Sequence, residues 1–114
     1  MLKLNHKQLK VWKKSIELIT EIYADTEDFP SEEKFGLTSQ LRRASVSIPS
    51  NIAEGASRKS EKERKRFYEI ARSSLVEVDT QMEIAISLNY FNQKKTERAE
   101  RLANEIFAML SAMV

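Results

Sequence analysis

Residues 37–63, LTSQLRRASVSIPSNIAEGASRKSEKE, decide the fold, because they join a helical apolar pattern, a proline within that pattern and a cationic turn. The apolar and small residues Leu37, Leu41, Ala44, Ile48 and Ile52 recur at spacings of three and four. That period places them on one face of a helix over about residues 37–56. It also turns the arginine pair of this stretch toward the opposite side, where we expect both side chains to be in water.

Pro49 falls inside this helical pattern. A proline in a helix interior removes one backbone hydrogen bond and kinks the axis. We therefore expect the helix to continue past Pro49 with a bend, and the hydroxyls of Ser45, Ser47 and Ser50 to bond the carbonyls that the bend frees. Small residues in the same stretch favour close packing, and Glu54 is spaced to pair with Arg58 at i,i+4.

Three further helices follow from the same period. Leu9, Trp12, Ile16, Ile19 and Tyr23 mark a first helix over about residues 7–25, and a short turn is expected at 31–34. Ser60 and Glu63 form a capping box at the start of a third helix. Asn89 is expected to end that helix in the left-handed region, and Asn92 to cap the start of a fourth helix. The positions that support these two helices are Ser60, Glu63, Phe67, Ala71, Ser74, Val78, Gln81, Ala85, Leu88 and Asn89 for the third, and Asn92, Ala99, Leu102, Ala103, Ile106, Met109, Leu110 and Met113 for the fourth.

The connections between these helices are short, and short connections place successive helices antiparallel. With only two glycines and two prolines in 114 residues, the composition also favours helices over strands joined by turns. We therefore predict an all-α fold, an antiparallel up-down-up-down four-helix bundle, with residues 1–114 as a single domain.

The chemistry available to the chain is narrow. Cysteine is absent, so no thiolate metal site can be built. His6, the only histidine, lies near a terminus and outside any Glu-x-x-His pair, so we expect neither a di-iron site nor a histidine-based catalytic triad. The two glycines cannot form a glycine-rich phosphate loop. We expect no enzyme, no cofactor and no metal. Apolar runs are too short to span a bilayer, and the chain is expected in the cytoplasm, without a membrane partner.

Charge is distributed unevenly along the first helix. Residues 1–16 hold five lysines and no acid, whereas residues 17–33 hold seven acids and no base. In an antiparallel bundle the start of the first helix lies beside the turn between helices two and three, which is also basic. A dense basic end can neutralise phosphates and bind nucleic acid with little sequence preference. The arginine pair of the second helix adds planar guanidinium groups that suit phosphate. The predicted nucleic-acid-binding residues, from the basic end and from this pair together, are Lys10, Lys13, Lys14, Arg42, Arg43, Arg58, Lys59, Lys62, Lys65 and Arg66.

A second interpretation of the same charges stays open. Solvated charged ends can attract neighbouring subunits, in which case the chain is a structural homo-oligomeric scaffold or protein-interaction adaptor that binds no nucleic acid. The serines near Pro49 have no base to activate them, so they are interpreted as packing residues rather than nucleophiles.

Three tracts, LKVWKKSIELITEIY (9–23), FGLTSQLRRASVSIPSNIAEGASRKS (35–60) and FYEIARSSLVEVDTQMEIA (67–85), together resemble the four-helix-bundle family of 23S rRNA-intervening-sequence proteins. This resemblance implies a ring of five subunits, encoded in some bacteria within insertions of large-subunit ribosomal RNA genes. The accessory proteins of diversity-generating retroelements look like relatives, which adds a reverse transcriptase to the expected partners: further copies of the chain, RNA or DNA, or another protein.

The resemblance implies no catalytic residue. It matches the family's arginine pair to Arg42 and Arg43, and two departures stand out, at Ser73 and Asn89, where the family pattern has glycine. Ser73 therefore puts close helix approach at that position in question. The residues matched to the proline-kinked tract, together with the neighbouring serine, form the predicted kink and packing set, which is Ser47, Pro49, Asn51, Glu54 and Gly55.

Overall fold

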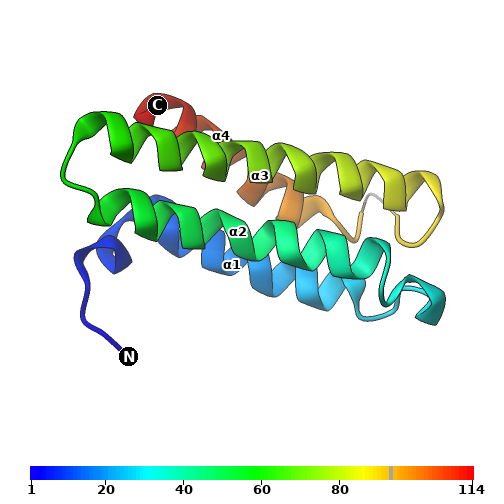
Figure 1. The fold of residues 1–114 in the computed structure, drawn as a ribbon. Helices are drawn as coiled ribbons and strands as arrows, with labels where there is room; N and C mark the ends of the chain where they lie inside the picture. The colour runs from blue at the N-terminus through cyan, green and yellow to red at the C-terminus, as the bar shows by residue number, and fades with distance from the viewer. Residues whose placement is uncertain (93) are drawn as a thin grey trace.

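The computed structural model describes residues 1–92 and 94–114, and in them every regular element is helical. Four long helices form the body of the molecule, and two short 3₁₀-helices precede the first two of them (Figure 1). The elements in chain order are η1 (Asn5–Gln8), α1 (Lys10–Thr26), η2 (Ser31–Glu33), α2 (Leu37–Ser57), α3 (Glu61–Ser87) and α4 (Glu97–Met113).

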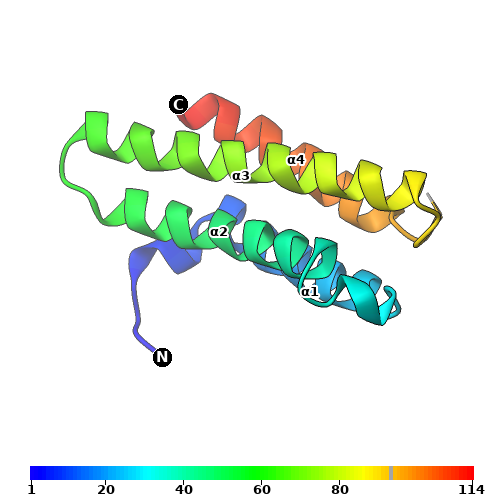
Figure 2. The same cartoon turned by 45° about the vertical axis from the view of Figure 1, so that its right-hand side comes forward.

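The helices form an antiparallel bundle in which α1 packs on α2, α2 on α3, α3 on α4 and α4 on α1. Figures 1 and 2 show one end of the bundle formed by the start of α1 and the α2–α3 turn, and the other end by the α1–α2 and α3–α4 connections. The predicted four-helix bundle is thus confirmed. The side chains at its centre that are almost fully buried are Leu18, Ile22, Leu41, Ile48, Ile52, Val78, Ile106 and Leu110.

Helix α2 follows the sequence closely. All five residues of its predicted stripe are buried, and the helix continues through Pro49, which is itself buried. The serine hydroxyls do not act as expected, however. Ser45 Oγ donates to the carbonyl of Arg42 at 2.8 Å, and Ser47 Oγ bonds Ser74 Oγ of α3 at 2.9 Å. Two of the three serines that were expected to bond the carbonyls freed by the proline therefore bond elsewhere, and one of these two, Ser47, joins α2 to α3.

Helices α2 and α3 approach closely at Gly55. A Cβ at this position would lie 2.7 Å from Cε1 of the buried Tyr68 ring and 3.1 Å from the carbonyl oxygen of Arg64. Asn51 Nδ2 holds Ser47 from within α2, donating to the carbonyl and to the hydroxyl of Ser47 at 2.8 and 2.9 Å. The small residues of α2 thus pack against α3 of the same chain.

The buried face of α1 differs from the predicted one. Val11, Ser15, Leu18 and Ile22 are buried, whereas Ile16, placed in the core by the sequence pattern, is 41 % exposed. One core position that the apolar pattern did not include is Ser15. Ser15 Oγ donates to the carbonyl of Trp12 at 2.6 Å, so a serine can occupy a core position without an unpaired polar group. The helix also begins at Lys10 rather than Lys7, after a 3₁₀ turn.

The predictions for the third and fourth helices differ from the structure in some buried positions of α3 and in the start of α4. In α3 the buried positions include Tyr68, Leu75 and Met82, which lie beside the expected stripe, while Leu88 is half exposed. The stop at Asn89 is confirmed, with φ of 62°. Asn92 does not cap α4, because its Oδ1 accepts from the backbone N–H of Lys95 at 2.9 Å and closes a turn before the helix begins at Glu97.

Candidate nucleic-acid interface

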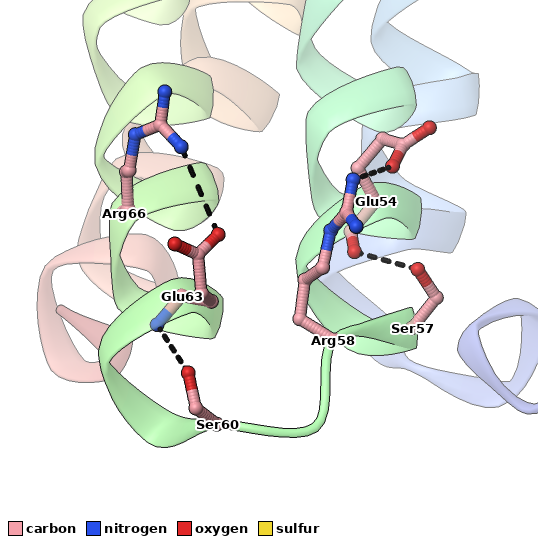
Figure 3. Close-up of polar contacts among 6 residues, drawn as sticks. All are labelled: Glu54, Ser57, Arg58, Ser60, Glu63 and Arg66. Atoms are coloured by element: carbon pink, nitrogen blue, oxygen red, sulfur yellow. Dashed lines mark hydrogen bonds and ion pairs between the residues drawn. The ribbon is translucent and has the colours of Figure 1, made fainter.

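The α2–α3 turn is held by an N-cap and by an arginine. Ser60 Oγ accepts from the backbone N–H of Glu63 at 3.1 Å (Figure 3), which satisfies one of the free donors at the start of α3. Arg64 Nη1 donates to the carbonyls of Arg58 and Lys59 at 3.1 and 2.7 Å. The guanidinium of Arg64 therefore holds the turn together through these hydrogen bonds, a role that the sequence pattern did not predict.

Four cations of this end are paired with carboxylates. Figure 3 shows two of these pairs, one on each side of the turn. Such solvent-exposed pairs contribute about 0–1 kcal/mol each and exchange readily for other partners. The pairs are Arg58–Glu54 at 3.0 Å, as predicted from the spacing, Lys65–Glu61 at 3.4 Å, Arg66–Glu63 at 3.7 Å, and Lys14–Glu105 between α1 and α4.

Glu105 was not among the acids expected at this end. Its carboxylate meets Lys14 from α4, and its pKa is lowered, chiefly by the hydrogen bond from Lys14. The contact depends on the register of α4 against α1, which the spacing within either helix does not specify. The basic end is consequently less positive than the first three helices alone suggest.

Four of the predicted lysines form no ion pair with any described residue: Lys10 and Lys13 at the start of α1, and Lys59 and Lys62 at the α2–α3 turn. All four side chains are exposed. The start of α1 and the α2–α3 turn, which carry these lysines, lie at one end of the bundle (Figure 1).

Phe67 supports the arginines of the turn. Its partly buried ring lies 4.9 Å from the guanidinium carbon of Arg58 and 5.5 Å from that of Arg66. Stacking on an aromatic face is worth about 0.5–1 kcal/mol at exposed sites. It also orders planar, phosphate-matching groups at the surface.

The arginine pair of α2 is not part of this end. Arg42 and Arg43 lie roughly 24 Å along the helix axis from Arg58, since each residue rises about 1.5 Å. Arg42 is half-buried rather than in water, because Nε donates to Thr26 Oγ1 at 2.9 Å and the guanidinium lies 4.5 Å from the Tyr23 ring. Arg43 is exposed and lines a groove between α2 and α3. The structure therefore brings together eight of the ten predicted residues.

The opposite end collects carboxylates in varied environments. Asp25 is buried, and burial, followed by the nearby Glu21 carboxylate, raises its pKa from 3.8 to about 6. Tyr90 donates its hydroxyl to Glu33 Oε2 at 2.6 Å, and this bond is the main reason why the pKa of Glu33 is lowered. Arg98 of α4 forms an ion pair with Glu21, and Lys95 of the α3–α4 connection forms one with Asp28.

The part of the chain that the structure describes indicates neither a metal centre nor a membrane span. Within residues 1–92 and 94–114, no cluster of histidine, aspartate and glutamate side chains could hold a metal ion. None of the helices described has the length and apolar character needed to cross a bilayer.

Comparison with known proteins bears on the fold and on the family. The family model described as 23S rRNA-intervening sequence protein matches residues 7–112. No curated protein matches the chain. A crystal structure of a protein of unknown function from the S23 ribosomal protein family of Bacteroides thetaiotaomicron is similar with a TM-score of 0.80 and 24% identity, over 90% of this chain and 96% of that one. At that identity the likeness concerns the fold.

Proposed function

The chain belongs to the 23S rRNA-intervening sequence protein family, and from this premise we propose that it is a non-enzymatic, self-associating cytoplasmic bundle that binds RNA or DNA through its basic end. The observation that carries the proposal is the group of exposed lysines without ion pairs at one end of the molecule, Lys10, Lys13, Lys59 and Lys62.

The proposed mode of binding is neutralisation of the phosphate backbone. Each phosphate that a lysine neutralises releases condensed counterions, so affinity falls steeply as salt rises. A lysine ammonium is a compact point charge without the planar fork that reads a base edge. The stacked guanidiniums of Arg58 and Arg66 can join the contact once phosphate replaces their carboxylate partners. Binding of this kind has little sequence preference.

The second candidate function is the scaffold without nucleic acid. The pairing of Lys14, Arg58, Lys65 and Arg66 with carboxylates favours it, because paired cations contribute less to the field that attracts a polyanion. The two functions differ in a measurable way, since only the first predicts binding that depends strongly on salt.

The test is a salt titration of RNA and DNA binding by two matched variants. Lys59→Ala with Lys62→Ala removes two unpaired charges from the basic end, whereas Lys34→Ala with Lys94→Ala removes two exposed lysines near the other end. We expect the first variant to weaken binding to any sequence and to reduce the slope of log affinity against log salt by roughly 0.7–0.9 for each lost phosphate contact. The control should bind as the wild type does.

Two results would overturn the proposal in favour of the scaffold. One is the absence of binding by the wild type at about 50 mM salt, where electrostatic attraction between exposed charges is only weakly screened. The other is an equal effect of both variants, since the basic end would then have no special part.

A further inference from the structure

A groove of about 370 Å³ runs between α3 and α4. Its apolar lining comes from Leu75, Val76 and Met82 on one side and from Ala103 and Phe107 on the other. Val76 is 50% exposed and Phe107 43% exposed. Exposed apolar side chains gathered along a groove can form a binding surface for an apolar segment.

The rim of the groove is acidic. Asp79, Glu83 and Glu100 line it, and none of the three forms an ion pair with another residue in the part of the chain that the structure describes. An occupant that matches both properties would carry apolar side chains together with positive charge.

The segment Met1–Leu4 has this composition. Its sequence is MLKL, and Leu2 and Leu4 are 69% and 48% exposed. Leu4 is in an extended conformation, and in an extended chain residues two apart share a side, while Lys3 between them takes the other. Lys7 Nζ donates to the carbonyl of Leu2, which ties this arm to η1.

The arm points away from its own groove. Figures 1 and 2 both show residues 1–4 leaving the bundle on the side of α1 and α2, with α3 and α4 on the far side. Four extended residues reach at most about 14 Å. We propose that residues 1–4 of one copy bind the α3–α4 groove of a second copy. Leu2 and Leu4 would lie on the apolar lining, and the long side chain of Lys3 would reach from the outer side of the arm to the acidic rim.

This inference rests on the self-association in the proposed function and specifies its contact. The surface that donates, the arm, differs from the surface that accepts, the groove. Such a heterologous contact builds rings when the rotation closes and open filaments when it does not. Each copy then offers one arm and one groove.

Size-exclusion chromatography with light scattering tests the contact on two variants and a control. Leu2→Ser with Leu4→Ser removes the apolar arm outside the helical bundle, and Val76→Arg blocks the groove at an exposed position. The matched control is Val46→Arg, at a valine of α2 that is 42% exposed and lies outside the groove. We expect both variants to run as single chains of 13.2 kDa, and the control to assemble as the wild type does.

Mixing the two variants gives the sharper result. The arm variant keeps an intact groove and the groove variant keeps an intact arm, so one contact can form and a species of twice the chain mass is expected, which grows no further. Circular dichroism checks that each variant is folded.

The outcomes separate this inference from the proposed function. A wild type that stays a single chain at high concentration overturns self-association itself, and with it the arm contact. A wild type that assembles while either variant assembles equally well overturns the arm contact alone. Single-chain variants that fail to form the mixed pair also overturn it.

Discussion

Adjacent residues of one type can have separate roles, as Arg42 and Arg43 do. Arg42 donates to Thr26 Oγ1 and stacks on Tyr23, which links α2 to the end of α1, whereas Arg43 forms no hydrogen bond, ion pair or ring contact with a described residue. Thr26 is buried and donates in turn to the carbonyl of Ile22 at 2.7 Å. The arginine therefore completes a small polar network within the fold.

We expect Arg42→Ala to lower the free energy of unfolding by about 1–2 kcal/mol, because it removes a charged hydrogen bond to a buried hydroxyl and a cation–π contact. The matched change Arg43→Ala should stay within about 0.5 kcal/mol of the wild type, as surface substitutions do. Urea unfolding of both variants measures the difference. Equal losses at the two positions would contradict the structural role assigned to Arg42.

Ionisation of Asp25 lowers the free energy of unfolding of the protein. Its pKa is about 6 in the folded protein, against 3.8 for the free group. The folded state thus holds the proton more tightly, and stability should fall as pH rises from about 4 to 6 and stay reduced above that. Glu21 repels the ionised form, and Lys95 offsets part of that cost.

We expect Asp25→Asn to raise the free energy of unfolding at pH 7 by roughly 1–3 kcal/mol, because one pKa unit corresponds to about 1.4 kcal/mol, and to remove this loss between pH 4 and 6. Glu27→Gln, at an exposed carboxylate nearby that forms no ion pair with a described residue, serves as the control. Denaturant unfolding across the pH range measures both. A variant that is less stable than the wild type at pH 7 would show that the ionised carboxylate supports the fold.

At the scale of the elements, periodicity predicts the existence, order and direction of the four helices but not the rotation of each. The predicted stripe of α3 shares Ala71, Ser74, Val78 and Ala85 with the buried face that the structure shows. The two differ only in the neighbouring positions on either side of these four residues. Both flanks have the same helical period, so contact with α2 and α4 decides between them. In α1, Ser15 reaches the core because its hydroxyl bonds its own helix.

The candidate site can likewise be predicted only in part from the sequence. Antiparallel topology predicts that the start of α1 meets the α2–α3 turn, which groups the lysines of the basic end. It cannot predict which cations are paired across helices, as Lys14 is with Glu105, since that depends on register. The prediction that Arg42 faces outward on α2 likewise cannot show that Tyr23 of α1 lies against it.

At the scale of the whole molecule, the basic end and the arm lie together at one end of the bundle (Figure 1). The groove runs along α3 and α4 instead. Lys10, Lys13, Lys59 and Lys62 belong to neither the arm nor the groove lining, so assembly through these two surfaces would leave these four lysines outside the contact. Several basic ends in one particle would bind one long strand together, and linked sites gain affinity that no single site has.

We therefore expect assembly to affect long and short nucleic acids differently. An oligonucleotide of about 10 nucleotides fills one site of the size typical for a single module, so the wild type and the Leu2→Ser, Leu4→Ser variant, which keeps every charge, should bind it alike. A strand several times longer engages several subunits of the wild type and only one of the variant, which should lower the variant's affinity by about 100-fold or more. Fluorescence anisotropy at fixed salt, with both lengths labelled, measures the two ratios. An equal loss for both lengths would mean that the arm itself touches the nucleic acid, and no loss for the long strand would mean that the subunits bind independently.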